Sequence, residues 1–129
     1  MASWTDVERI ALALPETSER ADHLGLRSWA VRDLMFAWER PLRKSELEAL
    51  SEPIAAGPIL GVRVADLTAK RALLANSRQG CFTTPHFDGY STVLVRLDEI
   101  GDADLWEVII DAWLARAPSW LVGTFLASE

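Results

Sequence analysis

The sequence predicts one α+β domain over residues 1–129, an antiparallel sheet with helices packed on one face. Three observations predict this class. Half of the 129 residues are hydrophobic, so the chain can bury a core without metal or disulfide bonds. Its apolar patterns run in the order helix, several strands, small helix, two strands and terminal helices, which is typical of the α+β class. No internal repeat or low-complexity segment interrupts that order.

The first helix is expected where apolar residues recur at helical spacing from Val7 to Leu14. Ser3 or Thr5 can cap it, and Glu8 stands in the capping-box position after Thr5. The chain therefore predicts a short amphipathic helix that leads directly into the strands.

A group of strands follows this helix. Arg20–Leu24 is a weak strand candidate before a turn at Gly25. Ser28–Trp38 is the segment richest in strand-forming residues, but it is long for one strand. The polar pair Arg32–Asp33 at its centre therefore predicts a hairpin turn.

The remaining elements can be predicted from strand patterns and capping residues. They are a connection over Pro41–Pro58 with little regular structure, a strand over Ile59–Ala65, a helix capped by Asp66 and reaching Ala75, strands over Cys81–Thr84 and Thr92–Leu97 around an Asp88–Gly89 turn, the longest helix from an Asp102 cap to Ala117, and a last short helix from Pro118.

Composition limits the environment and the partners. The chain carries 13 Lys plus Arg against 19 Asp plus Glu, a net charge of −6, which disfavours general attraction to nucleic acid but leaves room for a local basic face. Cys81 is the only cysteine, so no internal disulfide can form and a cytoplasmic location is expected. The N-terminus lacks the pattern of a signal peptide, and the apolar stretch Leu105–Leu114 is too short and too charged to span a membrane.

Strand alternation predicts an arginine cluster on the open face of the sheet. If the valine-rich side of each strand faces the helices, Arg32, Arg63 and Arg96 emerge together on the other side. Three guanidinium groups there could hold phosphates by bidentate hydrogen bonds. Three neutralised phosphates give a salt slope of roughly −2.7, which is weak and non-specific binding. The alternative is that these arginines are solvated and pair with nearby carboxylates.

Other side chains with chemical potential have ordinary interpretations beside functional ones. Cys81, His86 and Asp88 would form a nucleophilic centre only if the thiol reached the imidazole ring, and Cys81 also fits a small buried apolar residue. Trp106 and Trp113 lie on an apolar stripe and are expected in the core, which leaves Trp29 and Trp38 of the hairpin as candidates for stacking.

Metal and cofactor sites are not expected, because the sequence has no metal-ligand spacing and no phosphate-binding glycine loop. Asp104, Glu107 and Asp111 form an acidic ridge on the last long helix. This ridge is expected to be a solvated face, although it could also meet a basic partner.

The segment Thr83-Thr84-Pro85-His86-Phe87-Asp88-Gly89-Tyr90, followed by Val93-Leu94-Val95-Arg96-Leu97, resembles the MmcQ/YjbR family of small bacterial proteins. Further blocks support the resemblance in order along nearly the whole chain: Ala13–Glu19, Ser28–Arg32, Phe36–Trp38, Val62–Val64, Asp111–Trp113 and Ala117–Pro118.

The resemblance implies a frataxin-like (CyaY-like) fold, also compared with a double-wing DNA-binding arrangement, and a DNA-binding role inferred from that fold. One difference from the family concerns the first hairpin turn, where relatives commonly have Gly-Lys and this chain has Asp33-Leu34. An acidic residue therefore stands at a turn that is basic in relatives.

These observations lead to one hypothesis and two alternatives. The chain is expected to be a non-enzymatic binding module with DNA as its partner. The residues expected to make contact are Trp29, Arg32, Arg63, His86, Tyr90 and Arg96. The first alternative is a protein-interaction or regulatory domain, which suits the acidic total charge. The second, less favoured, is a small enzyme that uses Cys81 or His86.

Overall fold

The computed structural model describes residues 2–49, 57–75 and 80–127. The helices are α1 (Trp4–Leu12), α2 (Lys44–Ala49), α3 (Leu67–Ala75), α4 (Asp102–Arg116) and α5 (Ser119–Ala127), with a short 3₁₀ helix η1 (Pro85–Phe87). The strands are β1 (Thr17–Ala21), β2 (Arg27–Val31), β3 (Leu34–Glu39), β4 (Ile59–Arg63), β5 (Cys81–Phe82) and β6 (Thr92–Arg96). The middle of the expected Pro41–Pro58 connection lies outside the described residues.

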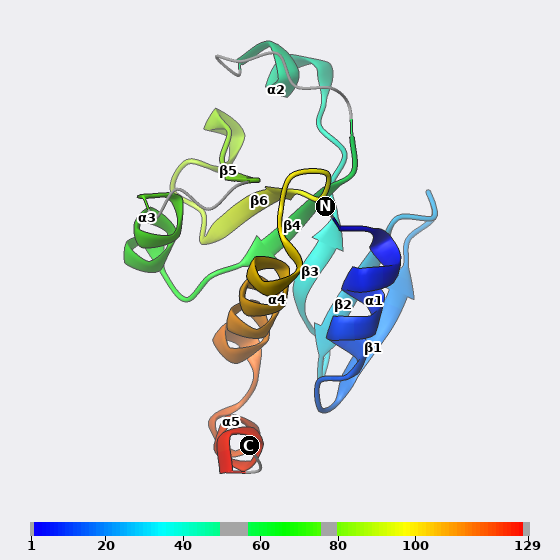
Figure 1. Cartoon of the computed structure of the whole chain (residues 1–129), viewed down its shortest axis with the longest axis vertical. Coiled ribbons are helices and arrows are strands. Elements are labelled where there is room, and N and C mark those ends of the chain that lie inside the picture. The colour runs from blue at the N-terminus through cyan, green and yellow to red at the C-terminus, as the bar shows by residue number, and fades with distance from the viewer. Residues whose placement is uncertain (1, 50–56, 76–79, 128–129) are drawn as a thin grey trace.

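The strands form one antiparallel sheet in the order β1-β2-β3-β4-β6-β5, so the predicted α+β class is confirmed (Figure 1). β1 and β5 are the two edges of the sheet. The loop that follows β5 therefore lies at the opposite edge from β1. The candidate site includes this loop and therefore lies at the β5 edge.

Helices α1 and α4 pack against one face of the sheet and against each other (Figure 1). The side chains that alternate toward this face bury the main core. Its largest fully buried members are Trp29, Trp113, Phe36, Leu60, Leu97, Ile100, Leu105, Ile109, Val7, Val31 and Val62. Trp106 was expected on the same stripe of α4, but its side chain is 49% exposed. That prediction is wrong, because the core-facing side of α4 passes through Leu105 and Ile109 and leaves Trp106 outside.

The other face of the sheet is partly covered. Ile59 and Leu94 are buried there against Phe87 of η1, and Leu42 and Phe82 pack around them. This second cluster arises because Ile59 and Leu94 alternate away from the main core. The face expected to be open is therefore closed at the end near α2 and η1.

The cap of α1 is one of the two residues expected from the sequence, whereas its capping-box partner and the cap of α4 differ from the expectation. Ser3 rather than Thr5 caps α1: its hydroxyl accepts from the Asp6 N–H at 3.3 Å, and the Asp6 carboxylate accepts from the Ser3 N–H at 3.0 Å. Asp6 therefore fills the capping-box position expected for Glu8. Gly101 is the cap position of α4, and Asp102 is the first helical residue.

The first strand is also shifted from its expected position. It covers Thr17–Ala21 rather than Arg20–Leu24. The carboxylate of Asp22 accepts hydrogen bonds from the N–H groups of Leu24 and Leu26, and Gly25 has a φ of 81°. This turn bends the chain directly after Ala21, so the strand must lie before it.

The predicted hairpin turn at Arg32–Asp33 is confirmed. Arg32 and Asp33 have φ values of 46° and 74°, the left-handed conformation that joins two twisted antiparallel strands. None of the helices that the structure describes is long and apolar enough to cross a bilayer.

Candidate functional site

The three arginines expected on one sheet face do not form a cluster. Arg32 lies in the β2–β3 turn rather than on a strand, so strand alternation does not set its direction. Its guanidinium pairs with Glu16 at 3.1 Å and lies over the ring of Trp120 of α5. This arginine therefore belongs to the end of the molecule that carries α5.

Arg63 and Arg96 do share a sheet face, but they lie at opposite ends of the β4–β6 pair. Arg63 stands opposite Thr92, and Arg96 stands opposite Ile59. The guanidinium of Arg96 pairs with Glu99 at 3.2 Å and covers the ring of Phe82. The prediction that these three arginines form one phosphate-binding surface is therefore corrected, because the three side chains lie apart.

Trp29 is not available for stacking. Its side chain has no exposed area, its ring stacks on Trp4, and its indole N–H donates to the Glu19 carboxylate at 3.0 Å. It is a core residue because β2 alternates it toward α1 and α4. Trp29 is therefore removed from the predicted contact residues.

His86 and Tyr90 lie together on one exposed loop at the sheet edge. We call residues Thr84–Tyr90 the histidine loop. Within it, the N–H groups of Phe87, Asp88 and Tyr90 donate to the carbonyls of Thr84, Pro85 and Phe87. Gly89 has a φ of 82°, which a glycine adopts easily. The loop is thus tightly turned, and it leaves the side chains of His86 and Tyr90 exposed.

A buried lysine holds this loop from the side of α3. The Lys70 ammonium donates to the carbonyl oxygen of Phe87 at 2.7 Å and to that of Tyr90 at 3.0 Å. Lys70 is only 6% exposed. Burial lowers the pKa of Lys70, and the charge of Asp88 opposes this shift. The ammonium therefore satisfies two loop carbonyls that no strand partner reaches.

A buried carboxylate holds the loop from the side of α2. Glu46 is 5% exposed and accepts from Arg40 at 2.8 Å, from the Arg43 N–H at 2.8 Å and from the Thr84 hydroxyl at 3.5 Å. Burial raises the pKa of Glu46, but the Arg43 N–H, the charge and hydrogen bond of Arg40 and the interaction with His86 outweigh it, so the pKa lies below its ordinary value. His86 is therefore near enough to Glu46 to interact with it electrostatically.

An apolar anchor completes the support of the loop. Phe87 is 8% exposed and packs on Ile59 and Leu94 of the sheet. The guanidinium of Arg40 lies over the Phe87 ring, 5.2 Å from its centroid. A cation above an aromatic face is attracted to it, so Arg40 stabilises both the ring and the Glu46 carboxylate.

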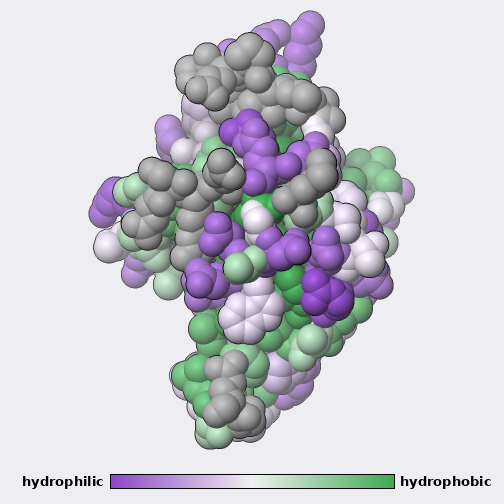
Figure 2. Space-filling model, in the orientation of Figure 1, coloured by the Kyte–Doolittle hydropathy of each residue, from purple (hydrophilic) through white to green (hydrophobic). Residues whose placement is uncertain are grey.

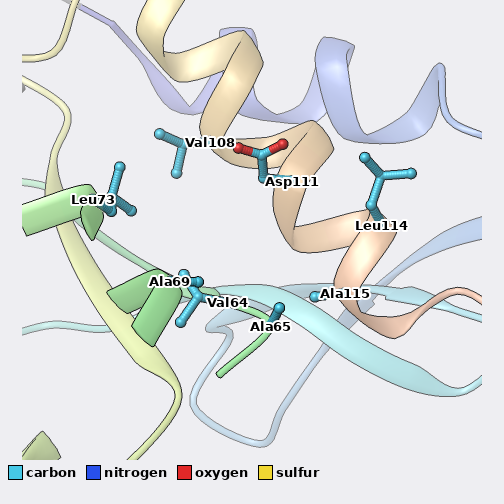
Figure 3. A pocket seen from close by; sticks show the side chains of 8 residues that line it. All are labelled: Val64, Ala65, Ala69, Leu73, Val108, Asp111, Leu114 and Ala115. Carbon is cyan, nitrogen blue, oxygen red and sulfur yellow. The ribbon is translucent and has the colours of Figure 1, made fainter. Parts of the chain in front are cut away.

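A cavity of about 260 Å³ opens between α3 and the histidine loop. Its lining combines charged and polar residues with the apolar side chains of α3, and the residues are Leu67, Lys70, Arg71, Leu74, Thr83, Asp88 and Gly89. A second cavity, of about 300 Å³, lies between α3 and α4 and is lined mainly by Val, Ala and Leu side chains (Figure 3). The first cavity is the better candidate, because polar groups converge on it.

Exposed basic side chains flank the histidine loop. Arg43 and Lys44 stand at the start of α2, and Arg71 stands on α3; no ion pair joins any of them to another described residue. Along the whole chain, basic residues are concentrated in the segment that contains this loop. Residues 40–97 contain eight Lys plus Arg and five Asp plus Glu, whereas the rest contains five and fourteen. The basic part of this acidic chain therefore includes the loop and both its supports.

Cys81 and His86 do not lie on the same side of the sheet. Cys81 stands opposite Val95 and packs against the main core, on a strand that α3 contacts. His86 contacts Phe87, which belongs to the cluster on the other face. The described residues thus do not bring the thiol and the imidazole together.

The groups that support the loop, Lys70, Glu46 and Arg40, were not among the site residues predicted from the sequence. One signal for Lys70 was present: Leu67, Lys70 and Leu74 follow one another at the spacing of a single helix face. A lysine on an apolar stripe indicates either a snorkelling side chain or a buried partner. Glu46 carried no comparable signal, because its loop partner Thr84 is 38 residues away. Arg40 carried none either, because the Phe87 ring that it covers is still further along the chain.

Comparison with known proteins gives a family and close relatives. A family model described as YjbR matches residues 12–115. Proteins from Mycobacterium bovis and from two strains of Mycobacterium tuberculosis are each 54% identical to the chain over 133 aligned positions, which cover 100% of this chain and 99% of each relative. Each of these relatives is described as an uncharacterized protein.

Proposed function

The chain belongs to the YjbR family, and we propose that it is a non-enzymatic binding module that contacts DNA weakly through the histidine loop and its flanking basic side chains. The proposal keeps His86 and Tyr90 as contact residues. It replaces the scattered arginines of the sheet with Arg43, Lys44 and Arg71.

The observation that carries the proposal is the double support of the loop by Lys70 and Glu46. Burying an ammonium and a carboxylate costs free energy, which hydrogen bonds and opposite charges only partly offset. Here both groups order a short surface loop whose neighbouring side chains remain exposed. A loop that is already ordered loses less conformational entropy on binding, so this arrangement suits recognition.

The exposed groups match the chemistry of a nucleic-acid backbone. Arg43 and Arg71 can donate two parallel hydrogen bonds to a phosphate, and Lys44 adds a point charge. Tyr90, at 60% exposure, offers an aromatic face on which a base can stack. The excess of basic residues in the segment 40–97 lowers the repulsion that the acidic remainder exerts on a polyanion.

Two further features support a binding role in the cytoplasm. The separation of Cys81 from His86 favours a module without a thiol–imidazole centre. A single cysteine, half-buried against the core, suits a reducing compartment.

Fluorescence anisotropy with a labelled DNA duplex tests the proposal. Three phosphate contacts give a salt slope of about −2.7, so affinity should fall about forty-fold between 50 and 200 mM salt. Arg71→Gln and Lys44→Gln should each reduce the slope by about 0.9. Arg20→Gln on β1, at the opposite edge of the sheet, is the matched control and should change neither value. Equal effects of all three variants would contradict the proposed surface.

A second candidate function, a protein-interaction domain, is favoured by α5. Trp120 and Leu126 on this helix are 57% and 54% exposed, and the end of the molecule formed by α5 is largely hydrophobic in Figure 2. Self-association is the simplest form of this function. Sedimentation velocity at rising concentration should then show dimers that Trp120→Asp removes, and a constant monomer would contradict it.

A further inference from the structure

The cavity of about 260 Å³ beside the histidine loop has both apolar and polar walls. Leu67 and Leu74 of α3 are its apolar residues, and the Leu67 side chain is 40% exposed. Lys70 and Asp88 are among its polar residues. Cavities that hold drug-sized ligands measure about 300–1,000 Å³, so this cavity suits a smaller flat group with polar edges.

Lys70 and Asp88 give the cavity one hydrogen-bond donor and one acceptor. Lys70 is 6% exposed, and its ammonium donates to two loop carbonyls, which leaves one of its three N–H groups without an acceptor among the described residues. The Asp88 side chain is exposed, and its carboxylate forms no hydrogen bond or ion pair with another described residue. A flat ligand in this cavity can therefore accept from Lys70 and donate to Asp88.

Arg71 connects this cavity to the proposed DNA-binding surface. Its side chain is exposed and lines the cavity, so a nucleotide whose phosphate lies on Arg71 has its base within reach of the cavity. A base inside a duplex cannot enter, because its faces are stacked and its pairing edge is occupied. The weak contact with DNA supplies too little free energy to pull a base out of a duplex, so the base must already be unpaired.

We propose that this cavity holds one unpaired base of DNA, and that cytosine fits it better than uracil. The inference rests on the proposed function, because Arg71 contacts a phosphate in both. Cytosine carries an amino group where uracil carries a carbonyl oxygen. The Asp88 carboxylate accepts from that amino group but repels the oxygen, whereas Lys70 can donate to the ring carbonyl that both bases share.

Fluorescence anisotropy with four labelled duplexes tests the inference. One duplex is fully paired, and the other three carry a single extra nucleotide in one strand: cytosine, uracil or an abasic residue. The cytosine bulge should bind about tenfold more tightly than the fully paired duplex, which is the effect of one well-stacked base. The uracil bulge should gain less. The abasic bulge should bind like the paired duplex, because it changes the shape of the DNA but offers no base.

Two variants with matched controls assign this gain to the cavity. Leu67→Gln should reduce the gain from the cytosine bulge to about twofold, because it removes an apolar wall. Leu12→Gln, which changes a leucine of similar exposure on α1, should keep the full gain. Asp88→Asn should make the cytosine and uracil bulges bind equally, because an amide can both accept and donate. Asp102→Asn at the start of α4 removes the same charge and should preserve the difference.

The fully paired duplex separates failure of this inference from failure of the proposed function. If it binds with a salt slope of about −2.7 and the cytosine bulge adds nothing, the inference is wrong and the proposed function stands. If none of the four duplexes binds, both are wrong. NMR gives a second test, in which the methyl signals of Leu67 and Leu74 should move with the cytosine bulge. Equal movement with the fully paired duplex would overturn the inference.

Discussion

The ammonium of Lys70 donates to the carbonyl oxygen of Phe87 at 2.7 Å, which joins helix α3 to a loop 17 residues further along the chain. The same ammonium reaches the carbonyl of Tyr90, the last residue of the loop. One buried side chain therefore determines the position of both ends of the exposed turn at Asp88 and Gly89. The proposed binding surface depends on this contact.

Lys70→Met should destabilise the protein by about 2 kcal/mol. The Tyr90 carbonyl loses its Lys70 donor, while the Phe87 carbonyl keeps only the Tyr90 N–H. An unpaired buried group costs about 1–3 kcal/mol, and relief of the buried charge offsets part of the loss. Denaturant unfolding measures this change. Arg71→Met, at the next and exposed position of α3, should change the stability by less than about 0.5 kcal/mol. Equal effects of the two variants would show that the Lys70 contacts contribute nothing.

Glu46→Gln should change how stability depends on pH. The pKa of the folded-state carboxyl lies below its ordinary value of 4.5, so its stabilising contribution is complete above that pH and is lost as the pH falls through the lower, folded-state pKa. The variant should be less stable than the original chain by about 2 kcal/mol at pH 7, and the difference should shrink below pH 4.5. Unfolding free energies measured from pH 7 to pH 3 test this; a difference that stays constant with pH contradicts it.

Gly61→Ala should destabilise the sheet by about 1–3 kcal/mol. A Cβ at Gly61 would lie 2.5 Å from the indole Cε2 of Trp38, so the rigid ring would have to move. Tryptophan fluorescence should shift together with the unfolding midpoint. Gly123→Ala in α5 is the control, because nothing lies within 4 Å of its added Cβ, and it should be neutral or slightly stabilising.

Gly89→Ala should weaken DNA binding through the conformation of the loop. No atom lies within 4 Å of an added Cβ, so the change acts only through the φ of 82°, which costs an L-residue about 1–2 kcal/mol. Anisotropy should show a several-fold loss of affinity. Gly101→Ala, also without contacts but with an ordinary φ of −79°, should bind as the original chain does, and a matching loss there would mean that the loop conformation is not involved.

Local patterns in the sequence predicted most of the elements but not how they meet. The Arg32–Asp33 turn, the helix after Asp66 and the two strands around Asp88–Gly89 follow from nearby residues and are observed. The first strand was misplaced, because the Asp22 turn that ends it depends on side-chain hydrogen bonds. The comparison with frataxin stays a prediction.

The candidate site could be predicted only in part. The family resemblance singled out His86 and Tyr90, and both lie on the exposed loop. The prediction of an arginine surface failed because strand alternation gives the sheet face of a residue but not its position along the paired strands. Arg63 and Arg96 share a face and still lie at opposite ends of their strands. The supports of the loop come from α2 and α3, and contacts over such sequence separations leave no periodic signal.

An NMR titration of the isotope-labelled protein with a DNA duplex tests the central claim most directly. At 50 mM salt, the backbone amide signals that move should be those of the histidine loop, the start of α2 and the exposed side of α3, and they should return as the salt concentration rises. Signals of β1 and α5 should stay in place. Perturbations confined to β1, α4 or α5, or no perturbation at all at millimolar DNA, would contradict the account.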